Sequence, residues 1–275
     1  MLEPWDRYLT RVHGVALTFP NAVFCLESAA ALLGLPLFGQ ARDVHLLVPG
    51  GVSRRYSDVV IHSYTCSDEI VDLNGICTTG LLETATQLCR IVPPAFALAI
   101  ADAVLRRLSA EGMTANLSDL AERAATSRGQ RQLRWVAQRA TPIAESVGES
   151  VSRAAIEWLG YPFPELQVTL THEGHNDRVD FRWRAHRIVG ESDGYGKYDA
   201  SNVAATRQLF VNEKLREDRI RRYERGFARW GWSDTMRPDR LDNKLRSAGL
   251  TPVRPQQKAL LDTLRTNPRS LPGSH

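Results

Sequence analysis

The chain has 275 residues, of which 43% are hydrophobic and 24% are charged, and its formal net charge at pH 7 is +4. These values are typical of a soluble globular protein of one or two domains, and the small positive charge allows nucleic acid as a partner without requiring it. The longest apolar stretch, about 12 residues over 94–105, is too short for the roughly 18–20 residues of a membrane span. The N-terminus carries Glu3 and Asp6 in place of the basic and apolar segments of a signal peptide, so we expect a cytoplasmic protein.

The charge is unevenly distributed along the chain. Residues 1–145 contain 13 arginines, no lysine and 14 acidic residues, a net charge of −1, whereas residues 146–275 contain 22 basic and 17 acidic residues, a net charge of +5. This difference predicts two units with different roles, and Pro142 marks the expected boundary. We therefore expect an N-terminal domain over residues 1–142, a second domain over residues 143–250, and a mobile, polar tail over residues 251–275.

The predicted elements follow a different order in the two domains. In the first domain, helical and strand patterns alternate: helices are expected at residues 27–34, 79–90, 95–108, 117–125 and 130–140, and strands at 44–48 and 59–62. In the second, a helix at 146–159 precedes strands at 164–171, 178–183 and 187–193, and then come a helix at 213–225, a strand at 227–232 and a helix at 238–248. Both orders predict an α/β (α+β) protein, with a mixed sheet flanked by helices in the second domain.

Acidic side chains gather on the predicted strands of the second domain. Asp180 lies between two apolar residues within a strand, and Glu191 and Asp193 share one face of the next strand. If these strands are neighbours, three carboxylates converge at their ends, and Glu149 on the preceding helix adds a fourth. Such a group must be protonated, paired or bound to a cation, and carboxylates are the ligands that Mg²⁺ or Mn²⁺ prefers. The cation can activate water for attack on a phosphate, whereas the alternative is that each acid is a solvated residue at a strand end.

Basic side chains lie next to these acids. Only four lysines occur in the chain, and two of them, Lys197 and Lys214, follow the acidic strand, where a cationic group can orient the attacking water and offset phosphate charge. The helix predicted from residue 213 carries five arginines that could contact DNA phosphates, namely Arg216, Arg219, Arg221, Arg222 and Arg225. The alternative for this helix is a solvated surface with ion pairs between residues four apart.

Five motifs of the second half together resemble a known family. They are SVGES (residues 146–150), RVDF (178–181), VGESDGYGKY (189–198), EKLREDRIR (213–221) and RWGW (229–232). They are similar to those of PD-(D/E)xK nuclease-like domains, in particular the subgroup akin to very-short-patch-repair endonucleases. The resemblance implies a restriction-endonuclease-like mixed sheet, with Asp180 and Glu191 as metal-binding acids and Glu149 as the helix acid. The family usually has lysine two residues after the second acid, and here that position is Asp193, so Lys197 or Lys214 replaces this lysine or the domain binds DNA without cutting it.

Two segments of the first half, ESAAALLGLP (residues 27–36) and residues 71–90, resemble the AbiE-type antitoxin region that precedes such a domain in actinobacterial proteins. Two hypotheses follow. In the first, the protein is a metal-dependent DNA endonuclease of defence or repair, with Mg²⁺ or Mn²⁺ as its cofactor. In the second, it is a non-catalytic, antitoxin-like transcriptional regulator with a degenerate nuclease fold, which binds DNA and a toxin protein or a second copy of itself.

Overall fold

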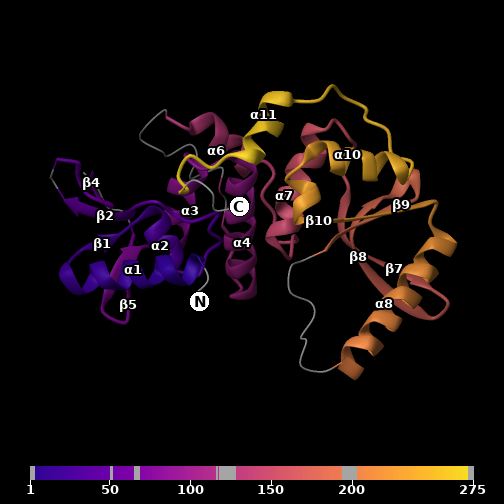
Figure 1. Cartoon of the computed structure of the whole chain (residues 1–275), viewed down its shortest axis with the longest axis horizontal. Coiled ribbons are helices and arrows are strands. Elements are labelled where there is room, and N and C mark those ends of the chain that lie inside the picture. Colours follow the sequence, from indigo (N-terminus) through magenta and orange to yellow (C-terminus); the bar gives the residue numbers. More distant parts are fainter. Residues whose placement is uncertain are drawn as a thin grey trace. The chain divides into compact units, whose positions relative to one another are not determined.

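The computed structural model describes residues 4–49, 52–64, 69–115, 117, 128–193 and 203–271. The chain divides into two compact units, of which unit 1 consists of residues 1–142 and 266–275 and unit 2 of residues 143–265 (Figure 1). The first division falls after Pro142, where the sequence places the start of the second domain. The predicted α+β class is confirmed, because each unit combines helices with a mixed β-sheet. In the described segments, no helix is both long and apolar enough to cross a membrane.

Unit 1 is built around a six-stranded sheet with the strand order β3-β4-β2-β1-β6-β5, in which β1–β6 and β2–β4 are the parallel pairs. Tyr8 and Val12 of the first helix pack with Phe24 and Leu46 of the sheet to form a core cluster. The strands are β1 (Val23–Phe24), β2 (Val44–Pro49), β3 (Arg54–Tyr56), β4 (Val59–Tyr64), β5 (Ile70–Leu73) and β6 (Ile76–Thr79). The helices are α1 (Pro4–Thr18), α2 (Leu26–Leu32), α3 (Leu81–Cys89), α4 (Pro94–Ala110) and α6 (Gln130–Ala137). The helix predicted at residues 117–125 lies outside the described residues, apart from residue 117.

The hairpin of β5 and β6 is an element that the periodicity of the sequence does not indicate. Leu73 pairs with Ile76 across a two-residue turn, in which Asn74 and Gly75 have φ angles of 56° and 87°. Asn-Gly favours this turn, because both residues tolerate positive φ and the turn matches the twist of the two strands. The dipeptide was therefore the available signal for the hairpin, since the strands themselves are only four residues each.

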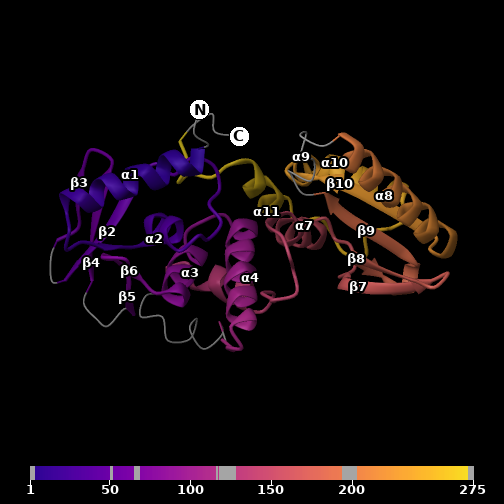
Figure 2. The ribbon, with the colours of Figure 1, turned by 90° about the horizontal axis from the view of Figure 1, so that it is seen from below.

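Unit 2 contains a four-stranded sheet with the order β10-β9-β8-β7, in which β9 and β10 are parallel and the other pairs antiparallel. Helix α8 lies along one face of this sheet (Figure 2), where its Ile220 packs with Val179 and Val189. Helix α7 packs on the opposite face, where Ser152 accepts a hydrogen bond of 2.9 Å from the indole N–H of Trp230. The elements are α7 (Val147–Trp158), β7 (Glu165–His172), β8 (His175–Trp183), η1 (Arg184–His186), β9 (Ile188–Asp193), α8 (Val203–Tyr223), β10 (Gly226–Gly231), α9 (Trp232–Thr235), α10 (Pro238–Ser247), α11 (Lys258–Asp262) and η2 (Thr263–Arg265).

The segment after residue 251 differs from the mobile tail that the sequence predicts. The backbone amides of Val253 and Arg254 donate to the carbonyl of Gly160 at 2.8 and 3.1 Å, and α11 and η2 follow. Gly160 has a φ of 88°, and a Cβ at this position would lie 2.0 Å from the carbonyl oxygen of Arg254, so the close approach requires glycine. The prediction of a mobile tail is wrong for residues 251–265, because backbone hydrogen bonds and buried leucines hold this part of the chain in unit 2.

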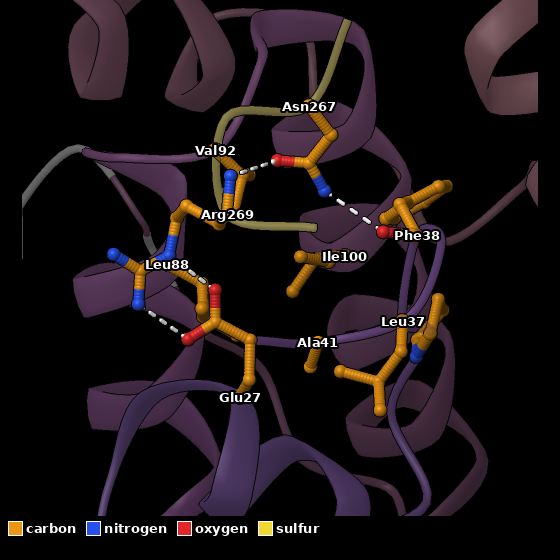
Figure 3. A pocket seen from close by; sticks show the side chains of 10 residues that line it. Glu27, Leu37, Phe38, Ala41, Leu88, Val92, Ile100, Asn267 and Arg269 are labelled. Atoms are coloured by element: carbon orange, nitrogen blue, oxygen red, sulfur yellow. Dashed lines mark hydrogen bonds and ion pairs between the residues drawn. The ribbon is translucent and has the colours of Figure 1, made fainter. Parts of the chain in front are cut away.

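Residues 267–271 belong to unit 1, where the Arg269 guanidinium forms a two-point ion pair with the carboxylate of Glu27 on α2 (Figure 3). The Asn267 side chain donates to the carbonyl of Phe38 at 2.8 Å, and Ser270 bridges to Ala41. Glu27 is only 6% exposed, and the guanidinium of Arg269 offsets the cost of burying its negative charge. Residues 267–271, which the sequence predicts to lie in a mobile tail, are therefore a structural part of unit 1.

A network of polar groups continues from this ion pair. Nη2 of Arg269 lies 3.1 Å from Nε2 of His45, and Nδ1 of His45 lies 3.0 Å from Nε2 of His62. Because a guanidinium can only donate, Nε2 of His45 accepts, and the neutral ring carries its proton on Nδ1. Burial lowers the pKa of His45 to about 4, and the Arg269 cation adds to this effect against the opposing carboxylate of Glu27. The network is therefore stable with His45 uncharged.

Replacing Arg269 by alanine should destabilise the protein by about 3 kcal/mol, because it leaves the buried Glu27 carboxylate without its cation. Calorimetric unfolding of the full-length variant measures the loss. The matched control is Arg246→Ala, which removes an exposed ion pair with Asp242 on α10 and should cost less than about 1 kcal/mol. Equal effects of the two substitutions would contradict the structural role of Arg269.

Acidification should weaken the protein through His45. Since the pKa of His45 is about 4 in the folded chain against 6.5 in the unfolded chain, its contribution to stability is present above pH 6.5 and is lost as the pH falls towards 4. The stability of the wild type relative to His45→Gln should accordingly fall by about 2 kcal/mol between pH 7 and pH 4.5. Urea unfolding of both proteins at the two pH values checks this, and a difference independent of pH would exclude it.

Candidate functional site

The alternation of side chains along strand β8 is interrupted at Asp180, so that residues before and after it face opposite sides of the sheet. Val179 packs with Ile220 on the α8 side of the sheet. The ring of Phe181 instead lies 5.3 Å from the ring of Trp230, centroid to centroid. Trp230 is on the other side, because its indole N–H is hydrogen-bonded to α7. Residues two apart on a regular strand share one face. The strand therefore turns over between Val179 and Phe181, and the residue at this break is Asp180.

The break also separates β8 from β9. The two strands pair from Trp183 with Ile188 to Phe181 with Gly190, and the pairing ends there. Beyond it, the carboxylate of Asp180 accepts a hydrogen bond of 2.9 Å from the backbone amide of Ser192. A side-chain oxygen thus occupies the place of a backbone acceptor, which brings the carboxylate of Asp180 between the two strands.

Glu149 is brought to the same place by the start of helix α7. Ser146 caps the helix and accepts a hydrogen bond of 3.1 Å from the backbone amide of Glu149, and the Glu149 carboxylate accepts one of 3.0 Å from the amide of Glu145. An acid in the first helical turn is stabilised by these unpaired amides and by the helix dipole. The sequence Ser-x-x-Glu therefore explains why Glu149 lies in the first turn of α7. Its side chain is only 4% exposed there.

Gln167 of β7 joins the two acids. Its Nε2 atom lies 2.8 Å from Oε2 of Glu149 and 3.3 Å from Oδ1 of Asp180. The pKa of Asp180 is raised to about 6, chiefly by burial and also by the carboxylates of Glu149 and Glu191, against the opposing hydrogen bonds from Ser192 and Gln167. Asp180 is thus a carboxylate with neutral donors and two acidic neighbours, which is an environment that a cation would relieve.

Glu191, by contrast, is held by arginine. It is 8% exposed, its Oε1 lies 2.6 Å and its Oε2 3.2 Å from the guanidinium of Arg216, and Arg229 lies 3.5 Å from Oε2. Asp193 is half-exposed and lies 3.7 Å from Arg229. The structure therefore brings Glu149 and Asp180 together, with Glu191 in electrostatic reach, and it leaves Asp193 at the surface.

The predicted metal ligands do not form a closed set. Among the described residues, no group of three or more histidine, cysteine, aspartate or glutamate side chains is arranged to hold a metal ion. The expected convergence of Asp180, Glu191 and Asp193 is therefore not found in the described structure, because Glu191 and Asp193 point to the α8 side and are compensated by arginines. The oxygen donors of Glu149, Asp180 and Glu191 suit a hard cation in kind, but Glu191 would have to exchange Arg216 for it.

The basic residues predicted for catalysis and DNA binding differ in their exposure and in their partners. Lys197 lies outside the described residues, and Lys214 is exposed on α8. Four of the five arginines predicted to contact DNA are paired with carboxylates: Arg216 with Glu191, Arg219 with Asp177, Arg221 with Glu217, and Arg222 with Glu173. The fifth, Arg225, is exposed. Only the Arg221–Glu217 pair is of the kind that the sequence left open as an alternative, an ion pair between residues four apart on the helix. The other three pairs join α8 to the strands or their hairpin.

The pair of Arg219 and Asp177 shows how an ion pair can keep an arginine of α8 from contacting a phosphate. Both of its hydrogen bonds measure 2.7 Å, and the two side chains are only 13% and 5% exposed. The guanidinium holds the pKa of the Asp177 carboxyl below its usual range. Binding a phosphate with Arg219 would leave the nearly buried carboxylate of Asp177 without its partner, which is strongly unfavourable.

Gln167 is the residue of the site that sequence reasoning missed. A neutral amide within a strand has no spacing or charge signal, and the residue reaches the two acids only because β7 pairs with β8. The Ser192 amide was equally invisible, since a backbone group carries no sequence signal at all.

Comparisons of the chain with known protein families, with characterised proteins and with solved structures find no match. The resemblance to PD-(D/E)xK nuclease-like domains and to AbiE-type antitoxins therefore stays a prediction from the motifs.

Asp180→Asn should stabilise the protein at pH 7.5 by about 2 kcal/mol, because it removes a carboxylate whose ionisation is opposed by burial and by two acids. The folded-state pKa lies above the unfolded value, so ionisation costs stability as the pH rises from 4 to 6, and the gain should vanish at pH 4. Urea unfolding at both pH values measures it. Asp193→Asn, at a half-exposed position, is the control and should change stability by less than about 0.5 kcal/mol. A loss of stability in Asp180→Asn at pH 7.5 would refute the account.

Proposed function

We propose that unit 2 is a PD-(D/E)xK nuclease-like domain that hydrolyses phosphodiester bonds of DNA with a divalent cation. The observation that carries the proposal is the half-buried carboxylate of Asp180, with a pKa of about 6, which shares the Gln167 amide with Glu149 and lies within electrostatic reach of Glu191. Further support comes from the mixed four-stranded sheet of unit 2 with helices α7 and α8 beside it, since the resemblance implies a mixed sheet flanked by helices.

The chain's own groups have distinct tasks in this proposal. Glu149, Asp180 and Glu191 would hold Mg²⁺ or Mn²⁺, which when bound activates a water and offsets charge on the phosphate. The Ser192 amide and Gln167 keep Asp180 oriented by hydrogen bonds of 2.9 and 3.3 Å. Near pH 7 Asp180 is mostly ionised, since its pKa is about 6, and so it can bind a cation. Lys197 and Lys214 are the candidates to orient the water, and Asp193 replaces the family's usual lysine.

A specific contact favours a second candidate function. Arg216 already neutralises Glu191 through two hydrogen bonds, so the second acid of the site has a partner without any metal. The second candidate is a DNA-binding, antitoxin-like regulator that has kept the fold and lost cleavage. Its partners would be operator DNA and a toxin protein or a second copy of the chain.

Cleavage assays of the full-length protein on plasmid DNA, linear DNA and RNA, with Mg²⁺, Mn²⁺ or EDTA, test the proposal. We expect metal-dependent DNA cleavage that falls by about 100-fold or more in Asp180→Asn and in Glu191→Gln, both of which preserve the size of the side chain. The control is Asp239→Asn, an exposed acid of α10, which should cleave like the wild type. Cleavage that survives both site substitutions would exclude this mechanism.

Arg216→Gln separates the two candidates. In a nuclease, the variant should need less Mg²⁺ for half-maximal cleavage, because the guanidinium no longer competes for Glu191. The regulator instead predicts no cleavage by any variant at any metal concentration, together with DNA binding that weakens steeply as the salt concentration rises.

A further inference from the structure

We propose that Gln167 is the positioning residue of the site, whose side-chain amide holds Glu149 and Asp180 at a fixed separation so that both can bind one divalent cation. This inference rests on the function proposed above. The two acids come from different elements, α7 and β8, and Gln167 on β7 bridges them from a third.

The chemistry of the amide suits this role. An amide NH₂ group has two hydrogens, and the Nε2 atom of Gln167 lies 2.8 Å from Glu149 and 3.3 Å from Asp180, so each carboxylate can receive one of them. A lysine or arginine at this place would join the acids equally well but would neutralise them, as Arg216 does for Glu191. The neutral amide orders both carboxylates and leaves their negative charge uncompensated, which is what a cation requires.

The backbone of Gln167 supports the same conclusion. Its φ is 51°, in the left-handed region that costs a side-chain-bearing residue about 1 kcal/mol or more. Its neighbours Leu166 and Val168 pair with Phe181 and Val179, the two residues between which β8 turns over. The unfavourable conformation therefore lies directly opposite Asp180, at the one place where it directs the amide to both acids.

A purely structural cross-link between α7 and the sheet would have the same contacts, so the test must separate metal binding from stability. Two variants of the full-length protein do this. Gln167→Met keeps the length of the side chain and removes the donors, whereas Gln167→Gly removes the side chain and also relieves the positive φ. The matched control is Ser57→Gly, which relieves a φ of 52° at an exposed position of unit 1.

The measurement is Mn²⁺ binding by titration calorimetry, accompanied by melting temperature and by the Mn²⁺ concentration for half-maximal DNA cleavage. We expect both Gln167 variants to bind Mn²⁺ about tenfold more weakly or worse, as loss of a group that orients a ligand does, and cleavage to recover at high Mn²⁺. Ser57→Gly should bind like the wild type. Melting temperatures identify any variant that fails to fold, in which case the other Gln167 variant decides.

The outcomes distinguish this inference from the proposed function. If the wild type binds Mn²⁺ and folded Gln167 variants bind it equally well, or lose only thermal stability, the positioning role is overturned and the nuclease proposal stands. If the wild type itself neither binds Mn²⁺ nor cleaves DNA, the proposed function fails, and the role of Gln167 in cation binding fails with it.

Discussion

A carboxylate that leaves water must be protonated, paired with a cation or surrounded by hydrogen-bond donors, because the low dielectric of a protein interior penalises an isolated charge. Asp180 meets this constraint in the third way, between the Ser192 amide and the Gln167 side chain. The arrangement of unit 2 around it follows. The strands β8 and β9 stop pairing at Gly190, the face of β8 changes, and Gln167 takes an unfavourable backbone conformation opposite the break.

The same chain contains the contrasting solution. In unit 1 the carboxylate of Glu27 is as buried as that of Glu149, but it has the guanidinium of Arg269 as its partner, contributed by the C-terminal segment. An acid compensated in this way holds two distant parts of a sequence together and has no spare charge for a ligand. The different partners of Glu27 and Asp180 therefore distinguish an acid that is neutralised by an arginine from an acid that has only uncharged hydrogen-bond donors.

Glu191 lies between these two cases. Its position on β9 next to β8 is the one that a metal ligand would have, yet Arg216 and Arg229 of α8 and β10 compensate it. Ion pairs also join α8 to the hairpin of β7 and β8 through Arg219 and Arg222. These ion pairs attach α8 to the sheet and neutralise Arg216, Arg219 and Arg222, whereas Lys214 on the helix and Arg225 after it are exposed.

Several elements could be predicted from local chemistry alone. The Ser146 cap and the apolar spacing of the residues after it predict α7 to within a residue at each end, and proline at the start of α10 marks that helix equally well. The class of the fold and the acids Glu149, Asp180 and Glu191 as neighbours also followed from patterns of spacing. The hairpin at Asn74-Gly75 was recognisable from its turn residues, while its short strands lack the length for a periodic signal.

The sequence by itself determined the fold class and many of the helices and strands, such as α7 and α10, because capping, periodicity and charge act over a few residues. Only the tertiary structure decided which acids Arg216, Arg219 and Arg222 neutralise, that Arg269 returns to Glu27, and that Gln167 joins Glu149 to Asp180. The side-chain contacts of Gln167 and Arg269 with these acids link residues 13 to 242 positions apart, between Gln167 and Asp180 at one extreme and Glu27 and Arg269 at the other. No local pattern encodes them, since each depends on which strands pair and which side chain then reaches a buried charge.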